Sequence, residues 1–272
     1  PEKEIRITQE PVVNWSAHEV FATEPPDEST RGVQTDFWNF RGLVERGYAG
    51  ATLCISEIFY DSPEAFQSSI YSLFLPPEKL TAPQRDFGAI GAWGLSRALD
   101  CLEHEPQIDS KRVIVHGHSR LGKTALWAGA VDPRFAMIIS NESGCGGASL
   151  SRRIFGETID FLLFWRTYWF SSAFQRYRNH EENLPFDQNF LIALAAPRPV
   201  YVASATDDLH SDPKVYRLFG AECRGLDPGR LPPSDVSIGG EIGYHIRTGS
   251  HDVTPLDWKF YMDFADRYFL KQ

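Results

Sequence analysis

The chain has 272 residues, of which 42% are hydrophobic and 23% charged, and this composition excludes a collagen, a coiled coil and a disordered chain. Its 36 acidic and 27 basic side chains give a net charge of −9, which argues against a nucleic-acid partner because nucleic acids bind basic surfaces. The most apolar stretch, 161–170, is interrupted by Arg166 and is too short to span a membrane, so no membrane partner is expected.

Neither the cysteines nor the first residues reveal a compartment. The four cysteines form no C-x-x-C pair, so a structural zinc site is not expected, and a disulfide framework is unsupported in a chain of this size. The opening residues Pro-Glu-Lys-Glu lack a methionine and the pattern of a signal peptide. We therefore expect a processed chain or a fragment.

Four apolar runs along the chain predict buried strands, because each is short and rich in apolar side chains. The last of them follows the breaker sequence Ala-Pro-Arg-Pro. These predicted strands are 48–56, 112–116, 135–140 and 198–205.

Helical patterns lie between and after these runs. Leucines at helical spacing predict a helix over 86–104, in which Gly91 and Gly94 permit close packing. A second helix is expected over 121–130, and the last begins at the N-cap Thr254, followed by a proline in the first helical position.

Strands that alternate with helices predict an α/β fold, with a doubly wound, mostly parallel sheet and helices on both faces in three layers. The aromatic-rich segment 157–190 is expected to form a helical excursion over that sheet. The segment 222–240 contains many glycines and prolines and predicts a surface loop.

The octet Gly117-His-Ser-Arg-Leu-Gly-Lys-Thr124 lies between a predicted strand and a predicted helix. It satisfies G-x-x-x-x-G-K-[ST], the phosphate loop of nucleotide hydrolases, but it also places Ser119 on the tight corner where esterases expose a nucleophile. The bulky residues at 118, 120 and 121 disfavour a phosphate cradle, while Leu121 replaces the glycine usual in the esterase corner. We favour the esterase interpretation over a nucleotide loop or a plain structural turn.

A serine nucleophile needs a base and an acid, which follow it in α/β-hydrolases in the order serine, acid, histidine. His251 lies just before the last predicted helix, where that fold presents its base. Asp208 follows the predicted strand 198–205, the usual place of the acid, and Glu142 follows the strand before it. Either carboxylate could instead be a helix cap or a surface charge, so the residues alone leave the acid open.

Five dispersed motifs lie between residues 117 and 252, within a similarity that runs in register from about Asp36 to the C-terminus. They are GHSRLGK at 117–123, NESGCGG at 141–147, GET at 156–158, LPFD at 184–187 and GYHIRTGSHD at 243–252. Together they resemble the glucuronoyl esterases, carbohydrate esterase family 15. The resemblance implies an α/β-hydrolase that cleaves, without a metal or organic cofactor, the ester between uronic acid groups of glucuronoxylan and alcohols of lignin.

The resemblance also implies catalytic roles. Ser119 matches the nucleophile, and His251 matches the base that takes its proton and returns one to the leaving alcohol. Glu142 matches the acid of fungal members, whereas Asp208 matches the acid at the usual hydrolase position, and some bacterial members carry both. Arg120 matches an arginine that stabilises the oxyanion together with nearby backbone N–H groups.

Substrate contacts are implied in the same way. Lys123 and Glu157 match residues that hydrogen-bond sugar hydroxyls. At the position of His210 the family often has a tryptophan that stacks on the sugar, so this chain departs from the pattern there. A histidine stacks more weakly and introduces a pH dependence.

Residues 1–47 show no three-strand pattern, although hydrolases of this type place three strands before the one predicted over 48–56. We therefore expect a single catalytic domain over 1–272 that lacks the first strands of the fold. The missing strands would come from polypeptide absent from this numbering, either a preceding segment or a separate chain.

The sequence thus predicts a serine esterase for glucuronic acid esters, as in lignin–glucuronoxylan cross-links. A second hypothesis is another carboxylic ester hydrolase, such as an acetyl xylan esterase. A third is an inactive carbohydrate-binding homologue, which the presence of serine, histidine and two acids in chain order disfavours. No obligate protein partner is evident, and the family implies a secreted or periplasmic location.

Overall fold

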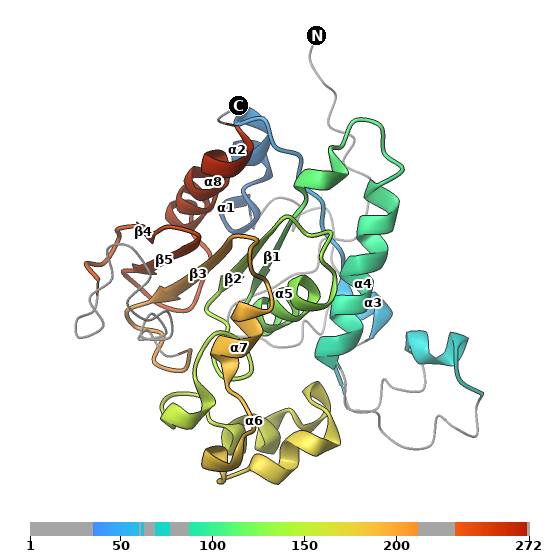
Figure 1. The fold of residues 1–272 in the computed structure, drawn as a ribbon, viewed down its shortest axis with the longest axis vertical. Helices are drawn as coiled ribbons and strands as arrows, with labels where there is room; N and C mark the ends of the chain where they lie inside the picture. Colours follow the sequence, from blue (N-terminus) through green and yellow to red (C-terminus); the bar gives the residue numbers. More distant parts are fainter. Residues whose placement is uncertain (1–34, 60, 63–68, 77–86, 212–231, 271–272) are drawn as a thin grey trace.

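The central sheet has five strands in the part of the chain that the computed structural model describes, which is residues 35–59, 61–62, 69–76, 87–211 and 232–270 (Figure 1). The strand order is β1-β2-β3-β5-β4, in which only β4 runs antiparallel to its neighbour. Strands β2 and β3 are buried along their whole length, because a parallel sheet covered on both faces buries successive side chains. The strands are β1 (Ile114–His118), β2 (Met137–Asn141), β3 (Val200–Ala205), β4 (Ile238–Gly239) and β5 (Ile242–Arg247).

Helices cover both faces of this sheet. Side chains alternate along a strand, so Ile138 packs into one core with α4 (Phe87–Leu102) and α5 (Arg120–Val131). Its neighbour Ile139 packs into a second core with α8 (Pro255–Phe269). Figure 1 shows α8 on one side of the sheet and α4 and α5 on the other. The predicted α/β-hydrolase architecture, a doubly wound and mostly parallel sheet in three layers, is confirmed.

Residues 151–193 form the helical excursion that the aromatic-rich sequence predicts, between β2 and β3. Its two ends are joined by Asp187, whose carboxylate accepts hydrogen bonds from the backbone N–H groups of Ser151 at 2.9 Å and Arg152 at 3.0 Å. The same carboxylate accepts from Gln188 N at the start of the last helix. The elements are η6 (Ser151–Arg153), α6 (Ile159–Trp165), η7 (Thr167–Trp169), η8 (Ser172–Tyr177), η9 (Glu181–Asn183) and α7 (Gln188–Ala193).

The predicted strand over 48–56 is wrong. Residues 48–54 adopt no regular structure, and Ile55–Ile58 forms the short helix α3. A short apolar run does not distinguish a strand from a buried helix, and here the side chains pack against α4 instead of joining the sheet. A Cβ atom on Gly94 would lie 2.5 Å from the Cδ1 atom of Ile58, so the predicted close packing at this glycine is confirmed.

Sequence analysis missed strand β5, because His245 and Arg247 interrupt its apolar pattern. The predicted loop 222–240 lies partly outside the described residues, and its described end contains β4. Residues 1–34 also lie outside the described residues, which leaves the expectation about missing strands untested. The described segments before β1 contain α1 (Thr35–Trp38), α2 (Phe40–Glu45), α3, η3 (Ile70–Leu73), α4 and η5 (Ser110–Arg112).

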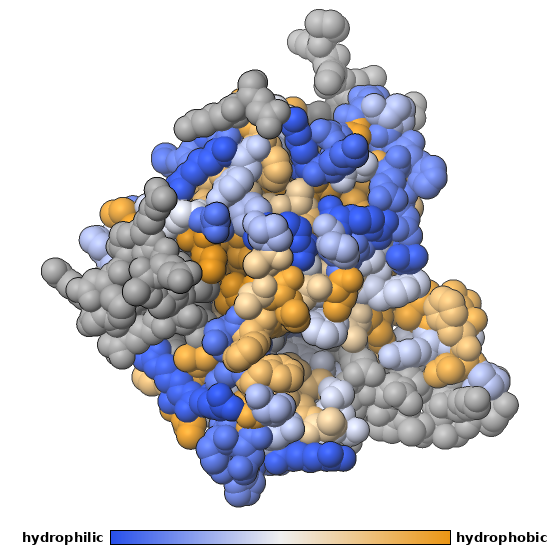
Figure 2. Space-filling view, in the orientation of Figure 1, coloured by the Kyte–Doolittle hydropathy of each residue, from blue (hydrophilic) through white to orange (hydrophobic). Residues whose placement is uncertain are grey.

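The surface carries scattered apolar groups. Figure 2 shows a hydrophobic patch over η3, where Leu73 and Phe74 are 74% and 65% exposed. Within the described ranges, no helix is both long enough and apolar enough to cross a membrane.

Candidate active site

Ser119 occupies a strained turn between β1 and α5. Its backbone has φ 57° and ψ −127°, a conformation that side-chain-bearing residues rarely adopt. Such strain persists where the surrounding structure imposes it, and a serine on a strained strand-to-helix turn is the corner predicted from sequence. The turn is fixed by a hydrogen bond of 2.9 Å from Ser119 N to Asn141 O at the end of β2.

The residues beside Ser119 explain how the turn tolerates Leu121. A Cβ atom on Gly117 would lie 2.0 Å from the carbonyl oxygen of Leu121, so only glycine fits at this position, two residues before the serine. Leu121 itself packs against the apolar cluster that includes Ile55 and Tyr168, which gives its side chain room. The close approach after the serine is made at Gly122, where a Cβ atom would lie 2.9 Å from that of Ser143.

His251 contacts both candidate acids. Its Nδ1 atom lies 2.7 Å from Asp208 Oδ2 and 3.1 Å from Glu142 Oε2. Both carboxylates are buried, whereas the His251 side chain is 39% exposed. The structure therefore brings all three residues together, as the hypothesis of a shared acid requires.

Hydrogen bonds donated by backbone N–H groups hold the two loops of this arrangement side by side. Gly249 N donates to Thr206 Oγ1 at 3.1 Å, and Asp207 N donates to Gly249 O at 2.9 Å. These bonds join the loop after β3, which carries Asp208, to the loop after β5, which carries His251. The parallel neighbours β3 and β5 end at the same edge of the sheet, which is why their loops meet.

The three groups differ strongly in their proton affinity. Burial lowers the pKa of His251, but the hydrogen bonds and charges of Asp208 and Glu142 outweigh it and raise this pKa to about 9. Burial opposes ionisation of Asp208, yet the hydrogen bond and charge of His251 lower its pKa to about 2. Burial raises the pKa of Glu142 to about 7, although His251 acts in the opposite direction. Asp208 therefore stays ionised at neutral pH, whereas the ionisation of Glu142 changes with pH near neutrality.

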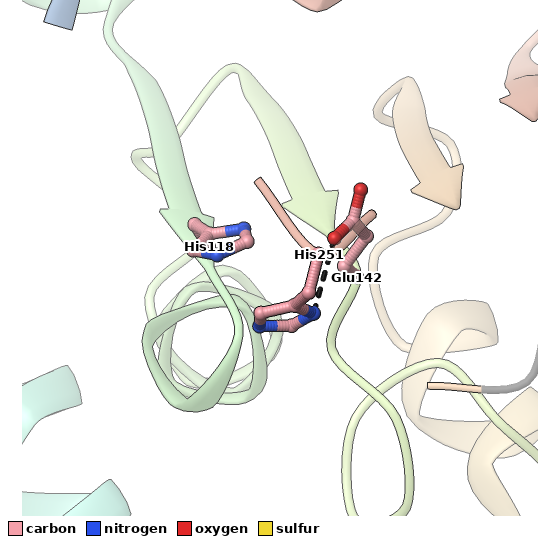
Figure 3. Close-up of side chains that lie close together, drawn as sticks. All are labelled: His118, Glu142 and His251. Atoms are coloured by element: carbon pink, nitrogen blue, oxygen red, sulfur yellow. Dashed lines mark ion pairs between the residues drawn. The ribbon is translucent and has the colours of Figure 1, made fainter. Parts of the chain in front are cut away.

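Figure 3 shows His118 beside His251, with Glu142 on the other side. The ring centroids of the two histidines lie 4.4 Å apart. Potential ligand atoms of these three residues lie within 4.8 Å of one another, which is compatible with a metal ion. However, Asn141 Nδ2 lies 3.0 Å from His118 Nδ1, and both oxygens of Glu142 accept hydrogen bonds. These hydrogen bonds favour a role for Asn141 and Glu142 in orienting the imidazole rings of His118 and His251 over a role in binding a metal ion.

Arg120 begins α5 directly after the serine. Its Nη1 atom lies 3.0 Å from Asp61 Oδ2, and both side chains are largely buried. Asp61 is held in turn by Trp169, whose Nε1 donates to Oδ1 at 2.7 Å. Burial lowers the pKa of Arg120 more than Asp61 raises it. Sequence analysis missed Asp61, which lies in a segment without a motif.

Lys123 and Glu157 form a partly buried ion pair of 3.0 Å. Lys123 Nζ also donates to the carbonyl oxygen of Ser143. These contacts occupy the lysine that a phosphate loop would need, so the nucleotide interpretation loses support. The structure brings both predicted sugar-contact residues together, on α5 and just before α6.

His210 lies beside this pair. Glu157 N donates to His210 O at 2.8 Å, and the exposed ring of His210 lies 5.8 Å from that of Phe161, measured between centroids. Phe161 is 40% exposed. The two rings together provide an aromatic surface beside Glu157.

Comparisons with known proteins agree with this geometry. The family described as "Glucuronyl esterase, fungi" matches residues 79–222. "Carbohydrate esterase MZ0003" of an unknown prokaryotic organism is 44% identical over 256 residues, which is 89% of this chain and 58% of that protein. "4-O-methyl-glucuronoyl methylesterase 1" of Phanerochaete chrysosporium is 41% identical over 125 residues, 43% of this chain and 26% of that protein. The chain thus spans little more than half the length of the first of these relatives.

Solved structures give the same result. The glucuronoyl esterase from Solibacter usitatus superposes with a TM-score of 0.82 and 40% identity, covering 90% of this chain and 66% of that one. A promiscuous CE15 esterase from a marine bacterial metagenome gives a TM-score of 0.80 and 41% identity, covering 98% of this chain and 70% of that one. The chain belongs to the glucuronoyl esterase family, carbohydrate esterase family 15.

Proposed function

We propose that this protein is a serine esterase that hydrolyses esters of glucuronic acid through an acyl-enzyme on Ser119. The observation that carries the proposal is the strained turn at Ser119 together with His251, whose Nδ1 atom contacts two buried carboxylates. Acyl transfer by this route requires a nucleophile, a base and an acid, and these residues are of the types that supply all three. Because the chain belongs to the glucuronoyl esterase family, we infer that the acyl group of the substrate is a glucuronic acid.

In the proposed reaction, His251 takes the proton of Ser119 as the hydroxyl attacks the ester carbonyl. Its Nδ1 atom is held by Asp208 and Glu142, so Nε2 is the atom that accepts this proton. The tetrahedral intermediate collapses when His251 returns the proton to the leaving alcohol. Water then attacks the acyl-enzyme by the same route and releases the uronic acid and Ser119.

The oxyanion forms beside the start of α5. The first backbone N–H groups of a helix have no partner within the helix, and α5 begins at Arg120. The Arg120 guanidinium, fixed by Asp61, adds a positive charge at the same helix end. We assign both to stabilising the negative charge that develops in the transition state.

Lys123 and Glu157 are proposed to bind the sugar hydroxyls. One side chain donates hydrogen bonds and the other accepts them, so the pair suits hydroxyl groups, which do both. His210 and Phe161 would contact the apolar face of the sugar ring. The polymeric substrate implied by the family, a lignin-linked glucuronoxylan, lies outside cells, so we place the enzyme in a secreted or periplasmic location.

Hydrolysis of benzyl glucuronate by the wild-type protein and by Ser119→Ala tests the proposal. We expect the variant to lose several orders of magnitude in kcat without a change in fold. Acetylated xylan serves as the competing substrate. Preference for acetylated xylan would favour an acetyl xylan esterase, and absence of hydrolysis on both substrates would favour an inactive homologue.

A further inference from the structure

A row of buried charged side chains extends from His251 into the protein. The proposed reaction uses Glu142 of this row, but not the residues beyond it. Arg247 is 5% exposed at the end of β5. Its Nη2 atom donates to Glu142 Oε1 at 3.0 Å, on the side of the carboxylate opposite His251. Its Nε atom lies 3.0 Å from Asp257 Oδ2 in α8. One guanidinium therefore lies between two buried carboxylates.

The far side of this row is rigidly fixed. Asp257 accepts hydrogen bonds from the backbone N–H and the hydroxyl of Thr254, each at 2.7 Å, and so also caps α8. Its other oxygen lies 2.7 Å from Nε2 of the buried His245, whose Nδ1 lies 3.0 Å from Tyr201 Oη. Because Asp257 has little freedom to move, it fixes the Arg247 guanidinium that it pairs with.

Arg247 also holds the loop that carries His251. Its Nη2 atom donates to the carbonyl oxygens of Ser250 at 2.6 Å and Asp252 at 3.2 Å, on either side of the histidine. Its Nη1 atom donates to Thr248 O at 3.1 Å. The same side chain therefore touches both the loop of the base and one of the two acids.

Arg247 favours the ionised form of Glu142, in addition to the hydrogen bond and charge of His251. Both of its oxygens accept hydrogen bonds, Oε1 from Arg247 and Oε2 from Asp252 N, so neither is placed to donate a proton. The groups that face the carboxylate are His251, Asp208 and Arg247, with His118 and Tyr261 nearby. Of these, Arg247 is the guanidinium, and it donates to Oε1 of Glu142.

We propose that Arg247 is a positioning residue that favours the ionised form of Glu142 and aims it at His251, and thereby makes the second acid available to the reaction. The role rests on the proposed esterase function. A buried carboxylate without a paired cation prefers its neutral form, which does not stabilise an imidazolium. Arg247 acts through Glu142 and does not touch the substrate.

A carboxyl NMR titration tests the proposal without any catalytic readout. The variants are Arg247→Gln, which keeps hydrogen-bond donors but removes the charge, and Arg247→Lys, which keeps the charge. We expect the pKa of Glu142 to rise by about one unit, a tenfold fall in its acid dissociation constant, in the glutamine variant and to stay near the wild-type value in the lysine variant. Arg46→Met, which removes an arginine between Asp263 and Asp266, is the matched control and should leave this pKa unchanged.

Kinetics in three backgrounds show whether Arg247 acts through Glu142. In the wild-type background, Arg247→Gln should lower kcat about tenfold, and in Glu142→Gln by no more than about twofold, because the coupled partner is already neutral. In Asp208→Asn the loss should be larger than in the wild type, since His251 then depends on Glu142 alone. The lysine variant is compared in the same backgrounds, in case the glutamine variant does not fold.

Two results would overturn the proposal. One is an unchanged pKa of Glu142 in Arg247→Gln, and the other is an equal loss of kcat in all three backgrounds, which indicates a purely structural role. A wild-type protein that hydrolyses no glucuronate ester would refute the proposed function instead, and the carboxyl titration would still decide the relation of Arg247 to Glu142.

Discussion

Glu142 Oε2 lies 3.1 Å from Nδ1 of His251, although Asp208 already contacts that nitrogen at 2.7 Å. An imidazolium that forms at His251 is therefore stabilised by two anions. A single proton on Nδ1 is shared between two acceptors, so either carboxylate alone retains part of the orientation and charge that the reaction needs.

This arrangement predicts partial redundancy of the acids. Glu142→Gln and Asp208→Asn should each lower kcat about tenfold or less, whereas the double variant should approach the roughly 10⁴-fold loss seen when a single-acid triad loses its acid. Steady-state kinetics on benzyl glucuronate measures the three values. A single variant as inactive as the double would show that only one acid works.

The same contacts predict a pH profile. The pKa of His251 is raised to about 9, so the free enzyme holds His251 protonated below that pH, and kcat/KM should rise with pH towards it. Removing an anionic neighbour lowers the pKa of an imidazolium. Glu142→Gln and Asp208→Asn should therefore move the acid limb of the profile to lower pH.

The matched control for this shift is Asp207→Asn, which removes a carboxylate from the neighbouring exposed position. Its acid limb should coincide with that of the wild type. An acid limb that stays in place in both Glu142→Gln and Asp208→Asn would contradict the assignment of His251 as the titrating base.

Arg120 and Asp61 should affect the chemical step more than substrate binding. Arg120→Met removes an interaction made with charge that develops only in the transition state, so kcat should fall about 10²- to 10³-fold with little change in KM. Asp61→Asn keeps an acceptor for Trp169 but loses the ion pair, and should lower kcat by a smaller factor in the same direction. A rise in KM with kcat unchanged would assign Arg120 to substrate binding instead.

Lys123 and Glu157 should affect substrate binding. Lys123→Met and Glu157→Gln each remove a hydrogen-bond partner of a sugar hydroxyl, so KM for glucuronate esters should rise about tenfold. Phenyl acetate offers no hydroxyls, and its hydrolysis should scarcely change. If both substrates lost activity equally, the pair would have a structural role, and equal efficiency of the wild type on both would leave only a generic esterase.

Much of the architecture follows from local sequence alone. The strands β1, β2 and β3 and the helices α4, α5 and α8 lie where apolar periodicity, Thr254 and the glycines of α4 predict them. These signals are local, because the period of apolar residues and the chemistry of a cap depend on a few neighbouring residues. Local patterns gave wrong predictions of secondary structure where contacts with distant parts of the chain decide whether a segment forms a strand or a helix. The apolar run 48–56 packs on α4 as coil and helix, and β5 is a strand despite its histidine and arginine.

The sequence by itself also indicated Ser119, His251 and two candidate acids, since the order of serine, acid and histidine along the chain is that of α/β-hydrolases. Only the tertiary structure decided how they are used. It placed both carboxylates on one nitrogen of His251, paired Arg120 with Asp61, and put Arg247 between Glu142 and Asp257. These residues are far apart in the chain, and the parallel strands bring their loops to one edge of the sheet. A buried charge such as Arg247 is stable only where its partners surround it, and that condition is not visible in a linear pattern.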